Sequence, residues 1–173
     1  MKTTIRVQLA FMMFLNFFVW GIWFVTMGTY LSTKLVADGV QIGLAYGTQS
    51  LGAIIAPFII GLIADKYFAA QRILGILHLI GGALLFNLSS QSLFNDFYPY
   101  LLIYMILYMP TLALVNAISF KQMTNPEKEF SFIRVWGTIG WIASGLLIGW
   151  LALEKDGSLD QTFKIDSLVS LIL

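Results

Sequence analysis

The sequence predicts an all-α membrane protein, a bundle of helices that crosses a bilayer several times. Its composition is the first reason: 58% of the 173 residues are hydrophobic and only 11% are charged, whereas soluble domains carry about 25% charged residues. The second reason is the arrangement of the apolar residues, which form long runs separated by short polar segments. A helix needs about 20 such residues to cross the hydrocarbon core of a bilayer.

Five segments are apolar enough to span a membrane, and they cover residues 7–31, 41–64, 73–88, 98–120 and 130–153. The first exceeds the apolar core of about 7–15 residues found in signal peptides, so we expect it to be retained. A sixth apolar run begins near Ile165, and the sequence stops at Leu173. So short a run cannot cross about 30 Å of hydrocarbon. We therefore expect a fragment of a longer protein, cut inside its sixth membrane helix.

Basic residues predict the orientation of these spans, because cytoplasmic loops are enriched in Lys and Arg. Six of them share one side of the membrane with the N-terminus, and three lie on the opposite side. The first group is Lys2, Arg6, Lys66, Arg72, Lys121 and Lys128; the second is Lys34, Lys155 and Lys164. The excess places the N-terminus in the cytoplasm.

Composition also argues against several classes of function. A net charge of +1 gives no reason to expect nucleic-acid binding. No cysteine and a single histidine, His78, make a metal site or thiol chemistry implausible, so no cofactor is expected. The spans hold no paired aspartates or Ser/His pair, which argues against an enzyme. All nine acidic residues fall in loops or at span ends. A proton site would then be His78 or would lie in another part of the longer protein.

The fifth segment carries the most informative pattern. At about 100° per residue, Arg134, Thr138, Trp141 and Gly145 fall on one face of the expected helix. An arginine near the middle of a membrane helix costs roughly 2.5–3.5 kcal/mol on insertion scales, which favours a face that lines a watery substrate pathway. The alternative is that Arg134 extends to the interface, since it follows the polar loop by only a few residues.

Polar and aromatic side chains mark other segments. In the first segment, Asn16, Trp20, Trp23, Met27 and Tyr30 form one helical stripe. Its indoles could stack on a flat ligand with a polar edge, or they could pack against neighbouring helices. Amides at mid-depth, Gln49 in the second segment and Asn116 in the fourth, could bind a ligand or hydrogen-bond between helices. For His78, hydrogen bonding between helices competes with a role as proton relay.

The second segment ends in a charged cluster of Asp65 and Lys66, with Arg72 after a short turn. A carboxylate beside cations at a helix end could form a latch that holds one conformation and breaks in another. An ordinary charged cytoplasmic loop has the same composition.

Several stretches together resemble a known family. Residues 61–66, GLIADK, resemble the loop 2–3 signature of the major facilitator superfamily, although the basic cluster after Lys66 is thinned. Residues 108–116, YMPTLALVN, and 133–140, IRVWGTIG, resemble the nucleoside:proton symporter family, the bacterial nucleoside permeases. The motif Trp20-Gly21-x-Trp23 fits that family as well.

This resemblance implies the N-terminal six-helix half of a twelve-helix transporter in the bacterial inner membrane. It implies import of nucleosides with protons, by alternating access, around a site shared with the C-terminal half. It also implies that Arg134 and Thr138 contact the nucleoside, with Trp141 in a position that is usually phenylalanine. The expected partners are a nucleoside, protons, the bilayer and the missing C-terminal half. A carrier of the same superfamily for sugars or another small polar solute remains the alternative.

Overall fold

The computed structural model describes residues 2–63 and 69–173. Over these residues the secondary structure is helical, without strands. The helices are α1 (Thr3–Phe24), α2 (Met27–Lys34), α3 (Gly39–Ile63), α4 (Ala70–Leu88), α5 (Phe94–Gln122), α6 (Pro126–Trp150) and α7 (Asp160–Ser170).

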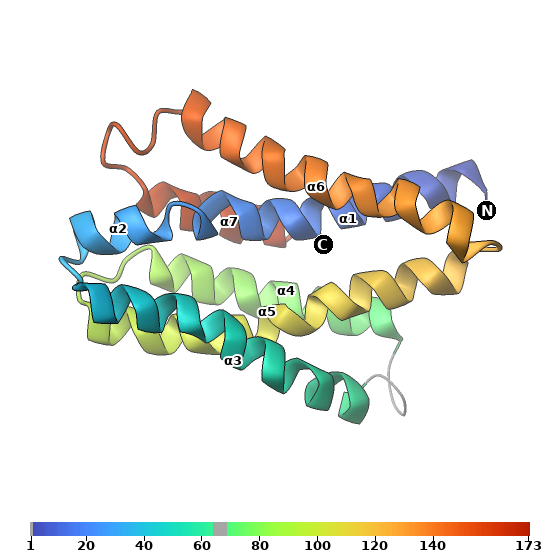
Figure 1. The fold of residues 1–173 in the computed structure, drawn as a ribbon, viewed down its shortest axis with the longest axis horizontal. Helices are drawn as coiled ribbons and strands as arrows, with labels where there is room; N and C mark the ends of the chain where they lie inside the picture. Colours follow the sequence, from blue (N-terminus) through green and yellow to red (C-terminus); the bar gives the residue numbers. More distant parts are fainter. Residues whose placement is uncertain (1, 64–68) are drawn as a thin grey trace.

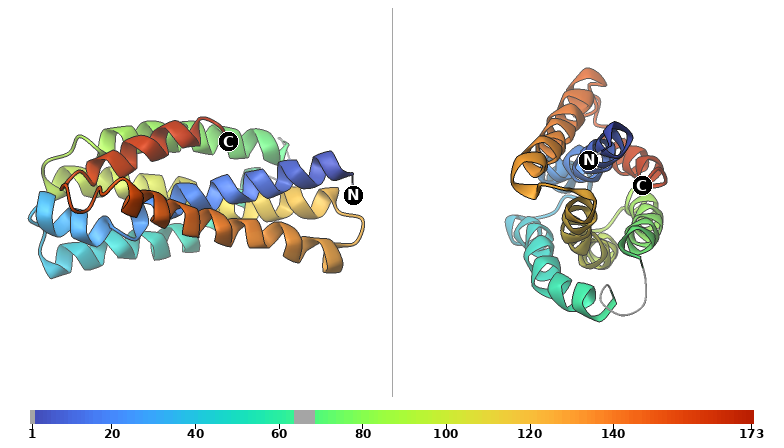
Figure 2. Two further views of the ribbon diagram at one scale, coloured as in Figure 1. Left: turned by 90° about the horizontal axis from the view of Figure 1, so that it is seen from above. Right: turned by 90° about the vertical axis from the view of Figure 1, so that its right-hand side faces the viewer.

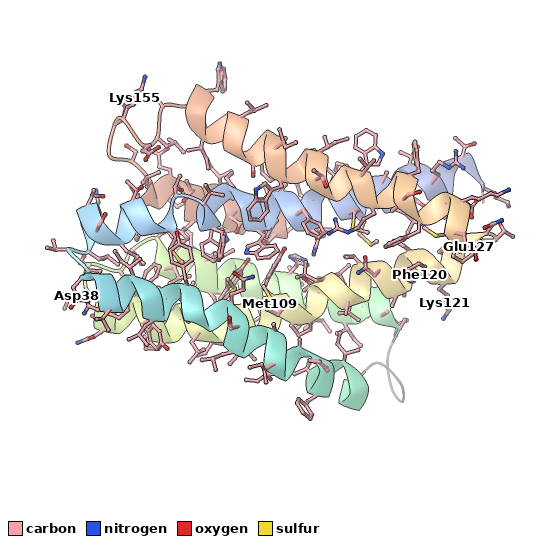
Figure 3. The ribbon with its side chains drawn as sticks, in the orientation of Figure 1. Asp38, Met109, Phe120, Lys121, Glu127 and Lys155 are labelled. Carbon is pink, nitrogen blue, oxygen red and sulfur yellow. The ribbon has the colours of Figure 1, made fainter. Side chains whose placement is uncertain are left out.

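The long helices lie roughly along one axis and form two neighbouring groups (Figures 1 and 2). Helix α1 packs mainly against α6, and α3 packs mainly against α5. Helix α4 packs against both α5 and α7, and α7 also contacts α1, so these contacts join the two groups. Charged side chains such as Asp38 and Lys155 lie at one end of the bundle, with Lys121 and Glu127 at the other (Figure 3).

Five candidate membrane spans occur in the described part of the chain: Thr3–Lys34, Gly39–Ile60, Ala70–Leu88, Phe94–Gln122 and Pro126–Trp150. Each is long and apolar enough to cross a membrane. Large apolar side chains such as Ile54, Phe58 and Leu146 are exposed on the outside of the bundle, as expected where lipid rather than water is the neighbour.

The first predicted span is not one continuous helix. Helix α1 ends at Phe24 and α2 begins at Met27, so the candidate span Thr3–Lys34, which contains the predicted segment 7–31, is interrupted at residues 25 and 26. The hydroxyl group of Tyr46 on α3 lies at the break. It donates to the Phe24 carbonyl oxygen at 3.3 Å and accepts from the Gly28 N–H at 3.1 Å. A neighbouring helix thus satisfies backbone groups that lipid could not.

Glycines bring the paired helices close together. A Cβ atom on Gly140 of α6 would collide with the carbonyl oxygen of Phe14 on α1. A Cβ atom on Gly52 of α3 would lie 2.5 Å from the Met105 carbonyl oxygen on α5. Small residues allow such close approach between membrane helices, which packing and dispersion then stabilise.

Candidate functional site

The start of α6 determines how deep Arg134 lies. Asn125 is the N-cap, its side chain accepts from the Lys128 N–H at 3.4 Å, and Pro126 occupies the first turn. The Glu129 carboxylate accepts from the backbone N–H groups of Thr124 and Asn125 at 3.0 and 3.2 Å. These are the interactions that begin a helix. The cap places the helix start eight residues before Arg134, which corresponds to about 12 Å along the axis.

The Arg134 side chain runs along α6, away from the start of the helix, and toward Phe17 on α1. Its guanidinium carbon lies over the ring of Phe17, 4.3 Å from the ring centroid. Its Nη1 atom would lie only 2.7 Å from a Cβ atom on Gly137, almost one turn further along the helix. A side chain reaching for the interface would extend the other way, toward the start of α6. The structure therefore places the guanidinium over an aromatic ring and not at the end of the bundle.

Arg134 is half-buried, and within residues 2–63 and 69–173 no carboxylate lies within ion-pair distance of it. A guanidinium has five N–H donors. A cation that is not neutralised, inside an apolar bundle, has donors left for a ligand or for water.

Aromatic rings continue the face that begins at Arg134. Phe17, Trp20 and Phe24 form a row along α1, which we call the aromatic row. The Trp20 and Trp141 rings meet edge to face with centroids 5.1 Å apart, and Phe24 lies 6.3 Å from Trp141. The Trp20 indole nitrogen is buried without a hydrogen-bond partner among the described residues. The structure thus brings Arg134, Trp141 and Trp20 together through this row.

Thr138 lies on α6 between Arg134 and Trp141, and it is exposed. Because it is one helical turn from each of them, its hydroxyl group shares their side of α6. Its role in binding stays a prediction.

The two amide side chains that the sequence predicted for the site, Asn116 and Gln49, belong to the other helix pair, α3 and α5. Asn116 of α5 lines a groove of about 590 Å³ between α3 and α5, together with Ala53, Pro57 and Met109. Its side-chain oxygen is buried and has no hydrogen-bond partner among the residues described. Gln49 is half-buried on α3, one turn before Ala53. Phe24 of the aromatic row packs on Tyr46, three residues before Gln49, and this contact connects the two helix pairs.

The residues of the stripe between positions 16 and 30 fall into two groups, which face different parts of the bundle. Trp23, Met27 and Tyr30 are fully buried, and Trp23 packs on Tyr104 and Phe163 inside the bundle. Trp20 is the member that turns toward α6. The structure therefore does not place Trp23 beside Trp141, and a solute contact from Trp23 would require it to leave the core.

His78 is hydrogen-bonded between helices. Its Nε2 atom lies 2.9 Å from the side-chain oxygen of Asn16 on α1, and both residues are buried. The Asn16 backbone oxygen accepts from the Tyr108 hydroxyl at 2.6 Å. This arrangement joins α1, α4 and α5 through polar contacts.

Asp166 departs from the sequence-based expectation. It lies in the middle of α7 and is fully buried, so the expectation that every acidic residue sits in a loop or at a span end is wrong here. The apolar run opens near Ile165, but α7 begins at Asp160 and carries Asp166 inward.

The predicted latch is only partly described. Arg72 is exposed in the first turn of α4. Asp65 and Lys66 lie outside the described residues, so the latch stays a prediction.

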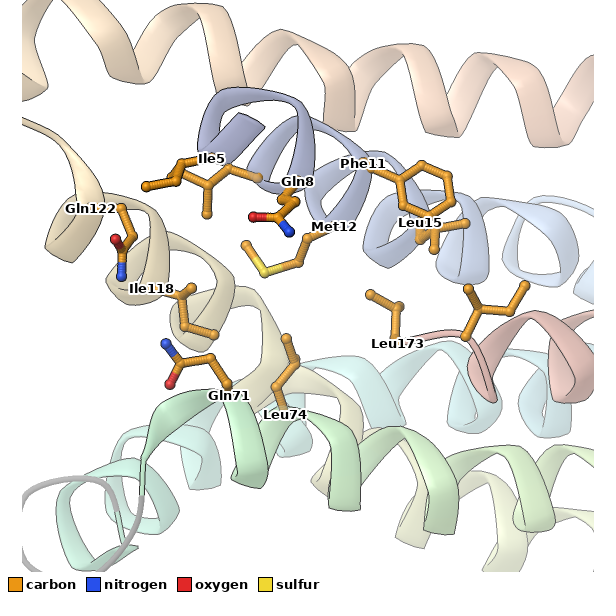
Figure 4. A pocket seen from close by; sticks show the side chains of 12 residues that line it. Ile5, Gln8, Phe11, Met12, Leu15, Gln71, Leu74, Ile118, Gln122 and Leu173 are labelled. Carbon is orange, nitrogen blue, oxygen red and sulfur yellow. The ribbon is translucent and has the colours of Figure 1, made fainter. Parts of the chain in front are cut away.

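Sequence reasoning missed Phe17 and Phe24 as neighbours of the site. Their signal was present in part: positions 17, 20 and 24 have the i, i+3, i+7 spacing of one helix face. A separate cavity of about 430 Å³ is lined by Gln8, Gln71, Gln122 and apolar neighbours, and it contains none of the predicted site residues (Figure 4).

Comparison with known proteins gives concordant matches. The profile described as nucleoside H⁺ symporter matches residues 1–173. The chain is similar to YegT of Escherichia coli, with 44% identity over 151 residues that cover 87% of this chain and 35% of YegT. It is also similar to the xanthosine permease of that bacterium, with 35% identity over 155 residues that cover 87% of this chain and 37% of the permease.

A solved structure agrees in fold. The crystal structure of the nucleoside transporter NupG superposes with a TM-score of 0.91 and 32% sequence identity, covering 96% of this chain and 42% of that one. This likeness confirms the predicted fold class, an all-α bundle that corresponds to the N-terminal part of a transporter. The chain spans about a third of the length of the curated relatives that it matches.

Proposed function

Because the chain belongs to the nucleoside H⁺ symporter family, an integral membrane family, we propose that the whole protein imports nucleosides by proton symport. This chain supplies the N-terminal six-helix half of a twelve-helix transporter. The binding site lies between this half and a C-terminal half, and it opens alternately to each side of the membrane.

The observation that carries the proposal is the direction of Arg134. Its guanidinium lies over Phe17, more than two turns inside α6, and Trp141 lies about two turns further along the same helix. A nucleoside offers ribose hydroxyls and base carbonyls to the donors of an arginine fork and a threonine hydroxyl. It also offers a flat base that an indole can cover.

In this proposal Arg134 and Thr138 hydrogen-bond the nucleoside and Trp141 stacks on its base. Trp20, which meets Trp141 edge to face at 5.1 Å, positions that ring. Asn116 and Gln49 contribute amides from the α3–α5 pair. The unpartnered oxygen of Asn116 supports this role, because a buried acceptor without a partner costs about 1–3 kcal/mol.

The proposal also covers the orientation of the protein in the membrane, its compartment and the cytoplasmic latch. We propose a cytoplasmic N-terminus, which the excess of basic residues on that side supports, and the inner membrane of a bacterium as the compartment. Asp65, Lys66 and Arg72 form a latch on the cytoplasmic side, which closes in one state of the transport cycle and opens in the other.

Uptake of labelled uridine by the full-length protein tests this function. We expect saturable uptake that other nucleosides inhibit, that sugars do not inhibit, and that stops when the proton gradient is collapsed. Inhibition by sugars alone would identify a sugar carrier of the same architecture. Uptake that no nucleoside inhibits would refute the proposal.

A further inference from the structure

A second polar region lies inside the bundle, away from the aromatic row. At its centre is the Asp166 carboxyl group of α7, which is fully buried and has no hydrogen-bond partner on either oxygen among the described residues. Three neighbouring polar atoms are also buried without partners: the Trp23 indole nitrogen, the Tyr104 hydroxyl and the Ser170 hydroxyl. We refer to Asp166, Trp23, Tyr104 and Ser170 as the acid cluster.

The contacts around Asp166 come from several helices. Trp23 of α1 and the hydroxyls of Tyr104 and Tyr108 on α5 lie close enough to the carboxyl group to interact with it electrostatically. On α4, a Cβ atom on Gly82 would lie 3.1 Å from the Ser167 carbonyl oxygen and 3.3 Å from the Ser170 Cβ atom. This glycine lets α7 approach α4 closely, and the close packing keeps Asp166 inside the bundle.

No cation compensates the carboxyl group within the described part of the chain. Lys164 on the same helix pairs with Asp160 at 2.8 Å, and its side chain is 48% exposed. The remaining titratable neighbours are Tyr104 and Tyr108 of α5, with Tyr30 of α2 and His78 of α4 further along the same network. His78 is already hydrogen-bonded to Asn16.

A buried carboxylate that no cation compensates costs several kcal/mol, and the usual response is to take up a proton. Protonated Asp166 has one O–H donor, and the unpartnered hydroxyls of the acid cluster are acceptors close by. Intramembrane carboxyl groups of this kind mark proton pathways in pumps and transporters.

We propose that Asp166 is a proton-binding residue of the transporter, located in the N-terminal bundle and distinct from the nucleoside-binding face. This rests on the proposed function, which requires a proton to accompany the nucleoside. The carboxylate takes one proton from water on one side of the membrane, and the carboxylic acid returns it to water on the other side.

Helix α1 connects the acid cluster with the nucleoside-binding face. Trp20 meets Trp141 on the nucleoside-binding face, and three residues later Trp23 packs in the acid cluster with Tyr104 and Phe163. In this proposal, a nucleoside that shifts α1 through Trp20 also shifts Trp23 relative to α7. Such a shared element couples two sites if each ligand favours one of its positions.

The test uses the full-length transporter in proteoliposomes and the variant Asp166→Asn, which has the shape of the protonated acid but cannot release a proton. We expect this variant to exchange labelled uridine for internal uridine as the wild type does. Its accumulation ratio under a proton gradient should fall to about 1, because uncoupled transport only equilibrates the solute. Asp156→Asn, at an exposed acid in the preceding loop, is the matched control and should accumulate uridine normally.

Infrared spectroscopy of the purified protein gives a readout that does not depend on the substrate. We expect a carboxylic acid C=O band at neutral pH that is missing in Asp166→Asn and present in Asp156→Asn. If the wild type does not transport uridine, the proposed function fails, and this band still decides whether Asp166 holds a proton. Accumulation by Asp166→Asn equal to the wild type, or a spectrum unchanged by that substitution, would overturn the proposal.

A further variant covers the case in which Asp166→Asn does not fold. Asp166→Glu keeps an acid in place, so it should accumulate uridine with a displaced pH dependence and a shifted acid band. A folded Asp166→Glu protein with the wild-type pH dependence and an unshifted band would contradict the role of this residue.

Discussion

The guanidinium group of Arg134 on α6 lies over the ring of Phe17 on α1, with 4.3 Å between its central carbon and the ring centroid. This contact directs a permanent cation toward the space beside Trp141 and away from the headgroups. Arg6 makes a comparable contact with Phe132, at 5.2 Å, near the N-terminal end of the bundle. The two arginines form a natural pair for comparison, because both stack on an aromatic ring and only one lies deep in the bundle.

Replacing Arg134 by Lys separates charge from geometry. Lysine keeps the charge but loses the planar fork that makes paired hydrogen bonds. If Arg134 binds the nucleoside, we expect the variant to lose a charged hydrogen bond worth about 1.5–3 kcal/mol, which is roughly a 10- to 150-fold weaker affinity. Binding of uridine to the purified full-length protein measures this. Arg6→Lys is the control and should bind normally, whereas normal binding by Arg134→Lys would favour a role at the interface.

Trp141 gives a graded prediction about stacking. Trp141→Ala should weaken uridine binding by about 1–3 kcal/mol, the range known for base stacking on aromatic side chains. Trp141→Phe should retain most of the affinity, because phenylalanine still offers a ring face. Equal losses in both variants, measured by titration calorimetry, would contradict stacking on the base.

The glycine contact between α1 and α6 should control stability. Gly140→Ala places a Cβ atom against the carbonyl oxygen of Phe14, a backbone atom that cannot swing away. Overpacking of this kind typically costs about 1–3 kcal/mol, so we expect a lower thermal unfolding midpoint of the detergent-solubilised protein. Gly149→Ala is the matched control on the same helix, because nothing lies within 4 Å of its Cβ position. That variant should unfold at or above the wild-type midpoint.

The two hydrogen bonds of the Tyr46 hydroxyl lead to a prediction about the break between α1 and α2. Tyr46→Phe leaves the half-buried Phe24 carbonyl and Gly28 N–H without their partner, and a polar group that loses its partner costs at most about 1–3 kcal/mol. We expect a clear loss of stability toward denaturant in mixed micelles. Tyr100→Phe removes a hydroxyl from an exposed tyrosine and should be neutral. A stable Tyr46→Phe protein would mean that water replaces the hydroxyl at no cost.

Sequence reasoning predicted the fold class because span length and apolar composition are properties of single segments. It predicted the shared face of Arg134, Thr138 and Trp141 for a similar reason, since helical spacing alone determines which side chains share a side. The direction of the guanidinium could not be predicted in this way. It depends on Phe17 from another helix and on the space left by Gly137.

Two features escaped prediction because partners distant in sequence decide them. The break after Phe24 carries no proline or glycine, and its backbone groups are satisfied by Tyr46 from α3. Asp166 resembled a residue at a span end because the apolar run starts beside it. The helix begins earlier, at Asp160, and packing against α1 and α4 encloses the carboxyl group.

The break between α1 and α2 lies beyond the aromatic row. Helix-terminal residues commonly absorb the dihedral changes of domain motions, and Val25 and Thr26 occupy such a position. Any movement of α2 about these residues would have to take Met27 and Tyr30, which are fully buried, out of the core. The side-chain hydrogen bond from Thr29 to Glu154, at 3.3 Å, ties α2 to the segment after α6. Movement of α2 would also break this hydrogen bond, so core packing and a polar contact together hold the segment beyond the break in place.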